Sequence, residues 1–335
     1  MKVSLVMSVY NGEEYLQETI DSILAQKYPD LEIIIVNNGS TDSTAKILNE
    51  INDERVKIIH LYMNQGVANG LNTAISHAEG DWIAIHDADD ISLPNRIEEQ
   101  VAYIQANPHV VAVGSFIQCI AGNNISHSKI EHMKNLQRYK NSIITWEQIK
   151  TDLFKGCPIT HGSLLMSKEA YLKAGRYNTQ YKIASDYDLF THLSAIGPIE
   201  NIPKVLYKYR ISSNSLSNSN VFETSNEFLL ASTKYIRNYC FSQKENAPSI
   251  IVFGSKKGCE TFKELMYTEN NFNVHKMMFR YRKEELAKAY IDYKEGKFDA
   301  FVILTSASED KNLLKFLKEK GLKQNSDFFT LWSAL

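Results

Sequence analysis

The chain has 335 residues, of which 44% are hydrophobic and 23% charged, and its formal net charge is −2. The length suggests about two domains, and the composition is that of a globular protein rather than a disordered or fibrous one. The near-neutral charge gives no reason to expect nucleic-acid binding. The four cysteines lie far apart without metal-ligand or redox spacing, so we expect reduced thiols in a cytoplasmic protein.

The N-terminal apolar run is interpreted as a strand rather than as a signal peptide. Ser4 and Ser8 interrupt it, and it leads into Asn11-Gly12 instead of a small-residue cleavage site. No apolar stretch of about 18 residues occurs elsewhere, so we expect no membrane-spanning helix.

The first hundred residues alternate between predicted strands and helices. Ile/Val-rich strands separated by amphipathic helices are typical of a parallel sheet that is covered on both faces. In such sheets ligands bind outside the carboxyl ends of the strands, where polar residues gather in this sequence. The strands are expected at 3–10, 32–38, 55–62 and 82–87, the helices at 13–26 and 66–78, a turn and helix at 39–51, and the polar loops at 10–11, 37–38, 64–66 and 87–90.

The next part of the chain is less regular. We expect a helix at 95–107, a strand at 110–120, polar irregular chain at 122–150, a strand and helix at 162–175, a helix from 185 to 197, a strand near 205–211 and a helix at about 221–243. Ser185 is the predicted N-cap of its helix, and the Ser/Asn-rich segment that follows residue 211 is expected to be a loop.

After Pro248 the alternation restarts, which predicts a second, smaller α/β unit. A strand at 249–254, a helix at 256–266, a strand at 298–306 and a helix at 309–321 are expected. Gly254 and Gly258 give only G-x-x-x-G, so binding of a dinucleotide is not expected. An interaction or acceptor-positioning module and a purely structural unit both remain open.

An acidic cluster directly follows the predicted buried strand at 82–87. Asp87, Asp89 and Asp90 suit a divalent cation such as Mg²⁺ or Mn²⁺, which prefers carboxylate oxygens and shares its shell with substrate phosphates. A helix N-terminal cluster is the main alternative. An EF-hand-like calcium loop ending at Glu98 is disfavoured, because Ser92 stands where that loop requires glycine.

These segments together resemble the inverting family 2 glycosyltransferases of the GT-A fold. The likeness rests on "VSLVMSVYNGEEYLQETIDSILAQKYPDLEIIIVNNGSTDST", "NQGVANGLNTAISHAEGDWIAIHDADD", "HGSLLMSKEAYLKAGRYN", "SDYDL" and "YRISSNSLS", and covers residues 1–217. The enzymes that build bacterial polysaccharides, capsules and lipopolysaccharide cores are the most similar group. The resemblance implies a Rossmann-like, mostly parallel sheet and a nucleotide-diphosphate sugar donor, with 218–246 a helical linker and 247–335 a small Rossmann-like domain.

The resemblance also implies a set of donor and metal contacts. Asp87 and Asp89 fall on the family's D-x-D motif, with Asp87 at the donor's ribose or sugar and Asp89 on Mn²⁺ or Mg²⁺. The further donor-binding positions are Ser8, Tyr10, Asn11, Glu14, Gly66, Asn72 and Arg210.

Asn38 departs from the family pattern. It falls where the family usually has the aspartate that accepts a hydrogen bond from uracil, and an amide oxygen can still accept that bond. Uridine therefore remains the expected nucleoside. Asn37 and Asn38 could otherwise be simple turn residues.

The implied general base is Asp186, because a sugar hydroxyl must lose its proton as it attacks. Asp188 is the alternative base, and both could instead be helix N-terminal acids. His161 is expected near the acceptor or as a structural histidine. Ser212 stands where the family often has histidine, and Arg210 could contact the diphosphate or be structural.

The sequence thus predicts an inverting, metal-dependent glycosyltransferase that uses a nucleotide-diphosphate sugar, with UDP expected. The expected acceptor is a bacterial glycan or lipid-linked oligosaccharide, and the expected location is the cytoplasm, either free or held by partners at the inner membrane face. An inactive sugar-nucleotide-binding or scaffold protein is one alternative. A nucleotidyltransferase is the other, although residues 8–16 lack the basic, glycine-rich loop it needs.

Overall fold

The computed structural model describes residues 1–123, 125, 127–212, 220–305 and 310–334, with the backbone alone at 127–129. The chain divides into two compact units. The first comprises Met1–Lys150 with Pro158–Asn218, and the second Thr151–Cys157 with Ser219–Leu335. Within the described ranges, no helix combines the length and apolar character needed to cross a lipid bilayer.

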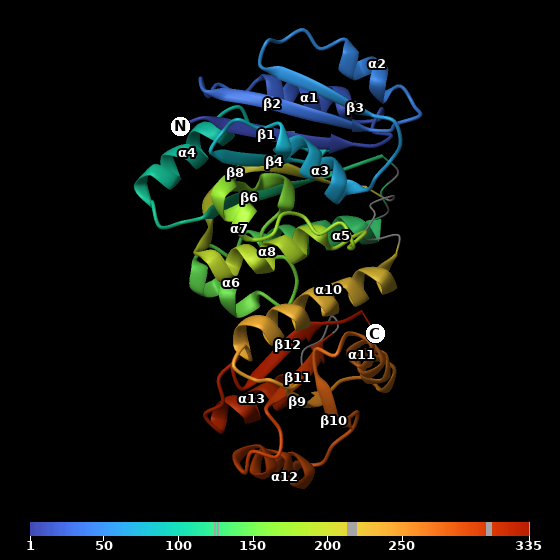
Figure 1. The fold of residues 1–335 in the computed structure, drawn as a ribbon, viewed down its shortest axis with the longest axis vertical. Helices are drawn as coiled ribbons and strands as arrows, with labels where there is room; N and C mark the ends of the chain where they lie inside the picture. The colour runs from blue at the N-terminus through green and yellow to red at the C-terminus, as the bar shows by residue number, and fades with distance from the viewer. Residues whose placement is uncertain (124, 126, 213–219, 306–309, 335) are drawn as a thin grey trace. The chain divides into compact units, whose positions relative to one another are not determined.

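The first unit is built on an eight-stranded, mostly parallel sheet (Figure 1). Its strands are β1 (Val3–Val9), β2 (Leu31–Asn38), β3 (Val56–Leu61), β4 (Trp82–His86), β5 (Ile91–Ser92), β6 (Ala112–Ala121), β7 (Leu165–Ser167) and β8 (Ile199–Ile211). They lie in the order β3-β2-β1-β4-β7-β6-β8-β5. The first four run parallel, whereas β7 is antiparallel to both of its neighbours and β5 is antiparallel to β8.

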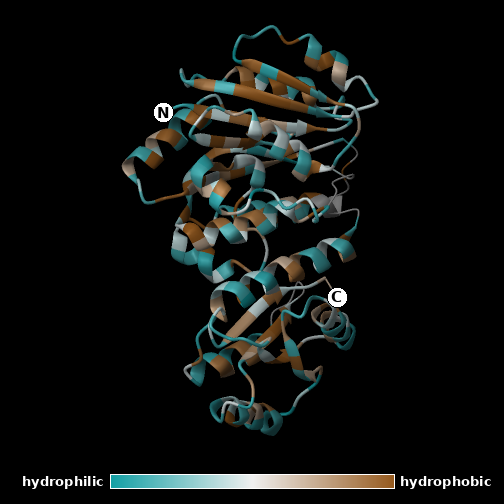
Figure 2. Cartoon of the chain, in the orientation of Figure 1, coloured by the Kyte–Doolittle hydropathy of each residue, from teal (hydrophilic) through white to brown (hydrophobic). Residues whose placement is uncertain are grey.

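The helices of the first unit join and cover these strands. They are α1 (Leu16–Leu24), α2 (Thr44–Asn49), α3 (Val67–Ser76), α4 (Arg96–Ala106), α5 (His127–Lys140), α6 (Trp146–Asp152), α7 (Lys168–Lys173) and α8 (Ser185–Ile196), with a 3₁₀ turn η1 (His161–Ser163). Figure 2 shows the apolar residues concentrated in the central strands and the polar residues on the outer faces of the helices.

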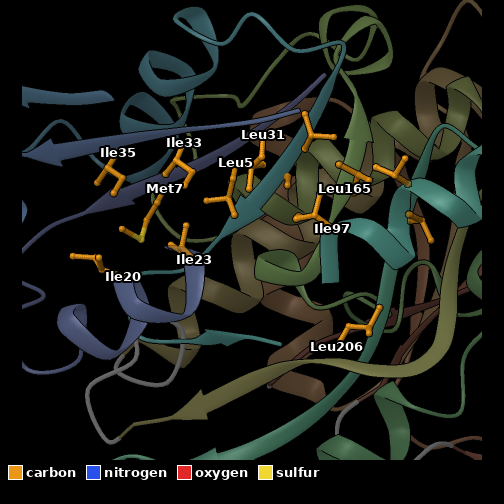
Figure 3. Close-up of a cluster of buried hydrophobic side chains, with 14 of the residues drawn as sticks. Leu5, Met7, Ile20, Ile23, Leu31, Ile33, Ile35, Ile97, Leu165 and Leu206 are labelled. Atoms are coloured by element: carbon orange, nitrogen blue, oxygen red, sulfur yellow. The ribbon is translucent and has the colours of Figure 1, made fainter. Parts of the chain in front are cut away.

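Strand alternation divides the apolar side chains between the two faces of the sheet. Leu5 of β1 and Ile33 of β2 lie in one buried cluster with Ile20 and Ile23 of α1, as Figure 3 shows. The spacing of Ile20 and Ile23 puts both on one face of their helix. Helix α3 packs against β1 and β2 on the opposite face. Truncating a side chain such as Ile33 to alanine in such a core costs about 2–5 kcal/mol.

The segment at 122–150 corrects the sequence-based expectation of irregular chain, since it contains α5 and α6. Within 130–140 only Met133 is buried, so α5 lacks the apolar stripe by which a helix is recognised. Side chains at its end bind β6 instead. Gln137 Oε1 accepts from the Cys119 N–H at 2.8 Å, and Asn141 bonds both the N–H and the C=O of Ile117.

The expected cap of α8 is also wrong. Ser185 is the first residue of the helix rather than its N-cap, and Ala184 occupies the N-cap position without a side-chain hydrogen bond. Asp186 therefore lies in the first turn of the helix.

The second unit has a four-stranded, fully parallel sheet in the order β10-β9-β11-β12. Its strands are β9 (Ser249–Phe253), β10 (Asn273–Met278), β11 (Ala300–Thr305) and β12 (Phe328–Trp332), and its helices are α10 (Val221–Tyr235), the π-helical turn η2 (Ile236–Cys240), α11 (Lys256–Glu269), α12 (Lys283–Lys294) and α13 (Lys311–Glu319). The sequence pattern predicts β9, α11, β11 and α13, but not β10, α12 or β12. Gly254 is explained by packing, because a Cβ there would lie 3.1 Å from Leu304.

Candidate active site

Parallel pairing brings the loops after β1, β2, β3 and β4 to one edge of the first sheet, as the strand pattern predicts. The loops after β1 and β2 are joined directly. The Asn11 N–H donates to Ser40 Oγ at 3.0 Å, and Asn11 Oδ1 accepts from the Thr41 N–H at 2.8 Å. Asn11 adopts a φ of 49°, which asparagine tolerates better than most residues. The polar edge is therefore a connected structure.

Asn38, at the end of β2, is fixed by the loop after β3. Its Oδ1 accepts from the Gln65 N–H at 3.0 Å, and its Nδ2 donates to Gly66 O at 3.0 Å and to Asn64 Oδ1 at 3.2 Å. The two backbone partners decide which end of the amide is oxygen. Both amide hydrogens are engaged, so one lone pair of Oδ1 is the hydrogen-bonding capacity that remains.

Asn37 has the contacts of a turn residue, the alternative considered for this pair. Its Oδ1 accepts from the Ser40 N–H at 3.1 Å, and its Nδ2 lies 3.1 Å from His60 Nδ1. Asn37 and Asn38 are both buried, so each supports the loop that follows its strand.

The other predicted nucleoside contacts differ in exposure. Tyr10 is half exposed beyond the end of β1, whereas Ser8 is partly covered by α3. A Cβ on Gly70 of α3 would collide with Ser8 Oγ, so glycine permits this close approach. Gly66, at the N-cap of α3, has a φ of 84° and open space where a Cβ would stand. Helix α3 is therefore open at Gly66 and packs closely against Ser8 at Gly70.

The three acids after β4 differ in their surroundings. The Asp87 side chain is 34% exposed, Asp89 is partly exposed and Asp90 is fully buried. Asp90 Oδ1 accepts from the Arg210 N–H at 2.6 Å. Burial and the charges of Asp87 and Asp89 hold the pKa of Asp90 well above its usual value. Asp90 therefore closes the turn from inside, which leaves Asp87 and Asp89 on the accessible side.

Asp87 and Asp89 differ in pKa. Burial works to raise the pKa of Asp87, but His161 and the charge of Arg96 outweigh burial and lower it. Burial and the negative charge of Asp87 raise the pKa of Asp89 from 3.8 to about 6. The carboxylates of Asp87 and Asp89 thus repel each other, and the positive charges nearby do not fully offset this repulsion.

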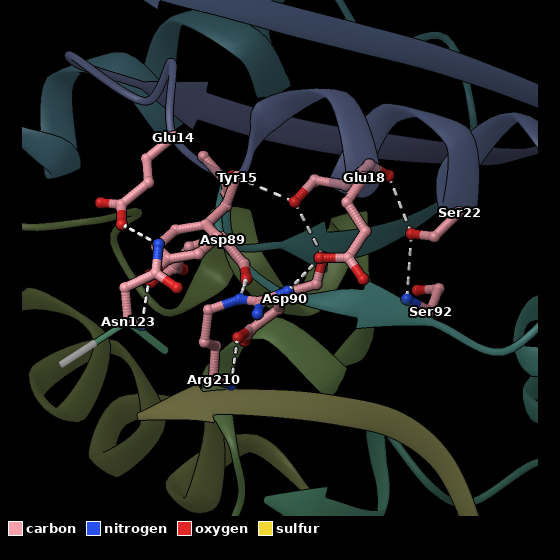
Figure 4. Close-up of polar contacts among 11 residues, drawn as sticks. Glu14, Tyr15, Glu18, Ser22, Asp89, Asp90, Ser92, Asn123 and Arg210 are labelled. Carbon is pink, nitrogen blue, oxygen red and sulfur yellow. Dashed lines mark hydrogen bonds and ion pairs between the residues drawn. The ribbon is translucent and has the colours of Figure 1, made fainter. Parts of the chain in front are cut away.

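Arg210 at the end of β8 holds the acidic turn in place (Figure 4). Its Nε donates to Asp89 O at 2.6 Å, its guanidinium pairs with Glu18, and its Cζ lies 4.3 Å from the ring centroid of Tyr15. With 8% of its side chain exposed, Arg210 has the contacts of a structural arginine. The alternative, a contact with a diphosphate, stays a prediction.

Glu14, another predicted donor contact, binds a loop of the protein itself. Its Oε1 accepts from Asn123 Nδ2 at 2.7 Å, and the Asn123 N–H donates to Tyr15 Oη at 2.8 Å (Figure 4). Glu14 is exposed, so it remains accessible from solvent.

A buried arginine beneath the acids was missed by sequence reasoning. Arg96 of α4 is fully buried, donates to Ile85 O at 2.8 Å and lies with its Cζ 5.0 Å from the ring centroid of Tyr207. Tyr207 in turn accepts from the Asp87 N–H at 3.2 Å. In the sequence Arg96 looks like part of a polar helix face. Its burial depends on β5 and β8, which no local pattern reveals.

His161 links the acidic turn to a buried tyrosine. Its Nδ1 lies 3.4 Å from Asp87 Oδ1, and its Nε2 lies 2.8 Å from Tyr177 Oη. Burial lowers the pKa of His161, but Asp87 and the charge of Asp186 outweigh burial and raise it. Asp186 also acts on Tyr177, whose pKa burial already raises. The structure therefore brings His161 and Asp186 close to the acids after β4.

Two other predicted site residues have structural contacts. Asp188 is 3% exposed, and its Oδ2 lies 3.8 Å from His192 Nδ1, whereas Asp186 is partly exposed. Both ends of the Asn72 amide bind the backbone of Tyr177. Of the two candidate bases, Asp186 is thus the more accessible.

The residues after β4 suit a divalent cation that is completed by a ligand. Within the described part of the chain, no three His, Cys, Asp or Glu side chains form a metal cage. Asp87 and Asp89 offer carboxylate oxygens, and Mg²⁺ is usually bound by one or two carboxylates together with substrate phosphates. The mutual repulsion that raises the pKa of Asp89 is what a bound cation would relieve. The donor set therefore fits such an ion.

Comparison with known proteins adds independent findings on the first unit. The family model for glycosyl transferase family 2 matches residues 4–174. An uncharacterized glycosyltransferase of Haemophilus influenzae is 35% identical over 218 residues, which cover 64% of this chain and 67% of the relative. The putative glycosyltransferase EpsE of Bacillus subtilis is 33% identical over 220 residues, which cover 64% of this chain and 74% of the relative.

Solved structures with low sequence identity share the fold. TarS 1–349 of S. aureus in complex with UDP-GlcNAc has a TM-score of 0.54 at 18% identity, covering 69% of this chain and 66% of that one. The mannosyltransferase PcManGT of Pyrobaculum calidifontis, in complex with GDP-Man and Mn²⁺, has a TM-score of 0.50 at 19% identity, covering 96% of this chain and 79% of that one. These likenesses confirm the predicted α/β architecture of GT-A type.

Proposed function

The chain belongs to glycosyl transferase family 2, and from this premise we propose that its first unit moves a sugar from a nucleotide-diphosphate donor to a hydroxyl group of a glycan. One observation carries the proposal. The carboxylates of Asp87 and Asp89 lie at the carboxyl edge of the parallel sheet, where α/β proteins bind ligands, with Asp186 close enough for its charge to act on His161. A donor bound at this edge would have a carboxylate available as base.

The proposed donor is a UDP-sugar. Asn38 supports it, because the lone pair left on Oδ1 can accept from an imino N–H, which uracil and guanine carry and adenine and cytosine lack. TarS in complex with UDP-GlcNAc supports a uridine donor, whereas PcManGT in complex with GDP-Man is a reason to test guanosine donors as well. The transferred unit is proposed to be a hexosyl or N-acetylhexosaminyl group.

We propose that Asp89, with Asp87, holds Mn²⁺ or Mg²⁺ together with the donor diphosphate. A divalent cation there supplies positive charge that offsets the charge of the departing diphosphate. The residues around the proposed cation site hold its carboxylates in place. Arg210 and Asp90 keep the acidic turn closed, and Arg96 provides a buried counter-charge for Asp87.

Asp186 is proposed as the general base. It would accept the proton of the acceptor hydroxyl while the oxygen attacks the anomeric carbon, and the bond to the diphosphate breaks on the opposite side. Attack opposite the leaving group inverts the configuration at that carbon. Partial exposure in the first turn of α8 supports this role for Asp186 over the buried Asp188.

The acceptor and the setting are proposed from the resemblance of residues 1–217 to bacterial polysaccharide enzymes. We propose a growing surface glycan on a lipid carrier as acceptor, with the protein in the cytoplasm at the inner face of the membrane. Residues 220–246, which cluster with the second unit, are proposed to form with residues 247–335 a module that positions the acceptor or binds a partner.

The Asp186→Asn variant tests the enzyme assignment. Nucleotide-sugars are first screened with Mn²⁺ by thermal shift, since a ligand of the native state raises its stability. The wild type is expected to hydrolyse the selected donor slowly, and Asp186→Asn is expected to bind it equally well but to lose at least about 100-fold in rate. Glu98→Gln, which removes an exposed carboxylate, is the control.

Two results would count against the proposal in different ways. If Asp186→Asn hydrolyses the donor at the wild-type rate, another group is the base. Donor binding without turnover in the wild type, tested also with glycan acceptors, would favour the alternative of an inactive sugar-nucleotide-binding protein.

A further inference from the structure

The imidazole of His161 is held between a carboxylate and a phenol. Its Nδ1 lies 3.4 Å from Asp87 Oδ1, its Nε2 lies 2.8 Å from Tyr177 Oη, and 15% of the side chain is exposed. At 3.4 Å the contact with Asp87 is longer than a usual hydrogen bond, and because an ionised carboxylate can only accept, a proton on Nδ1 makes the contact attractive. Each ring nitrogen of His161 therefore faces a polar partner.

Tyr177, in the loop after α7, is itself held by a residue of α3. Asn72 of α3 accepts from the Tyr177 N–H at 3.2 Å and donates to Tyr177 O at 2.9 Å, and Tyr171 Oη donates to the same Asn72 oxygen at 2.5 Å. The Tyr177 ring meets the His161 ring edge-on, at 88° and 5.8 Å between centroids. Helix α3 therefore supports the imidazole indirectly, because Asn72 holds Tyr177 and Tyr177 contacts His161.

Gly162, the residue after His161, lies close to the carboxylate of Asp87. A Cβ on Gly162 would lie 2.6 Å from Asp87 Oδ2, so the turn η1 approaches this oxygen as closely as its backbone allows. His161 faces one oxygen of Asp87 and Gly162 faces the other. The side chain of Asp87 nevertheless stays one-third exposed and open to a ligand.

We propose that His161 is a positioning residue that aims the Asp87 carboxylate at the donor, with Tyr177 fixing the imidazole. The inference rests on the proposed function and extends it, since sequence reasoning gives His161 only as an acceptor contact or a structural residue. Asp87 needs such support because its neighbour Asp89 carries like charge and would otherwise turn it away. Loss of the contact should weaken donor binding before it affects the chemical step.

Two substitutions separate the nitrogens of His161. The amide nitrogen of His161→Asn can occupy the position of Nδ1 and keep the contact with Asp87, whereas that of His161→Gln reaches the position of Nε2 and keeps only Tyr177. Calorimetric titration with the nucleotide-sugar and Mn²⁺ is expected to give His161→Asn a Kd within about 3-fold of the wild-type value. The Kd of His161→Gln is expected to be at least about 10-fold higher. His109→Asn, at an exposed histidine, is the control.

Equal losses in the two variants, or weaker binding by His161→Asn than by His161→Gln, would overturn the inference. If either variant fails to fold, Tyr177→Phe replaces the pair. It keeps the ring, and it is expected to weaken donor binding by about 3- to 10-fold, whereas unchanged binding would refute the proposed support.

A second readout needs no donor. Imidazole ¹⁵N resonances of the ligand-free protein should show His161 Nδ1 protonated at neutral pH and above, with this signal altered in Asp87→Ala. An unprotonated Nδ1 would contradict the contact on which the inference depends. A wild type that binds no nucleotide-sugar but shows the protonated Nδ1 would instead refute the proposed function and leave the Asp87–His161 contact standing.

Discussion

Replacing Asp89 by asparagine should make the protein more stable while it removes its proposed function. Burial and the charge of Asp87 raise the pKa of Asp89 from 3.8 to about 6, so its negative charge is disfavoured in the folded state. Asparagine has nearly the same shape and no charge. A site that binds a cation and its ligand is expected to be destabilised by repulsion between its own acids when both are absent. The residue that serves function then lowers stability.

The magnitude follows from the shift in pKa. A group whose folded pKa lies above its unfolded pKa favours folding at low pH, and this contribution is lost as the pH rises through the interval between the two values. For Asp89 that interval runs from 3.8 to about 6. At about 1.36 kcal/mol per pKa unit, the advantage of Asp89→Asn should stay below about 1 kcal/mol at pH 4 and approach about 3 kcal/mol at pH 7.5.

Urea unfolding at pH 4 and pH 7.5 measures this difference. In a Trp332→Phe background the remaining tryptophans, Trp82 and Trp146, both belong to the first unit and report its unfolding. Asp81→Asn removes an exposed carboxylate beside the other end of β4 and serves as the control. The reasoning is refuted if the free energies of unfolding of Asp89→Asn and its parent differ by the same amount at both pH values.

Two further substitutions test the edges of the site. Asn38→Asp restores the residue that is usual in the family. It should nevertheless lower the free energy of unfolding by about 1–3 kcal/mol, because a carboxylate oxygen would face Gly66 O in place of an N–H donor. Equal or greater stability at pH 7.5 would argue against the observed amide network. Gly162→Ala would put a methyl group against Tyr207 Oη and 2.6 Å from Asp87 Oδ2. It should lower the stability of the first unit by about 1–3 kcal/mol and weaken donor binding, and wild-type behaviour in both assays would contradict the tight packing of η1.

The layout of the sheet and its polar edge could be predicted because they depend on local patterns. Residues 3–9 and 31–38 are nearly continuous apolar runs followed by polar residues, and the helix between them has its apolar residues at helical spacing. Parallel pairing then places the ends of both strands at one edge. Position in the sheet thus follows from sequence order, and the chemistry at the edge follows from the residues that end each strand.

Other features depend on contacts between distant segments. Helix α5 is held to β6 largely by polar side chains, so no apolar stripe marks it in the sequence. Arg96 is buried, although Glu98, two residues further on, is exposed. Tyr177 contacts His161 while Asn72 of α3 binds its backbone. Each of these contacts joins residues from separate elements, and a pattern within one element cannot reveal it.

The central claim, that Asp89 and a donor diphosphate together hold a divalent cation, is tested most directly by the electron paramagnetic resonance signal of free Mn²⁺. Wild-type protein is expected to deplete this signal at pH 7.5 only when a UDP-sugar is present. At pH 5 it should deplete the signal much less, because the raised pKa of Asp89, about 6, leaves its carboxyl largely protonated there. Asp89→Ala should leave the signal unchanged. Equal depletion by wild type and Asp89→Ala, or no depletion with any UDP- or GDP-sugar, would contradict the claim.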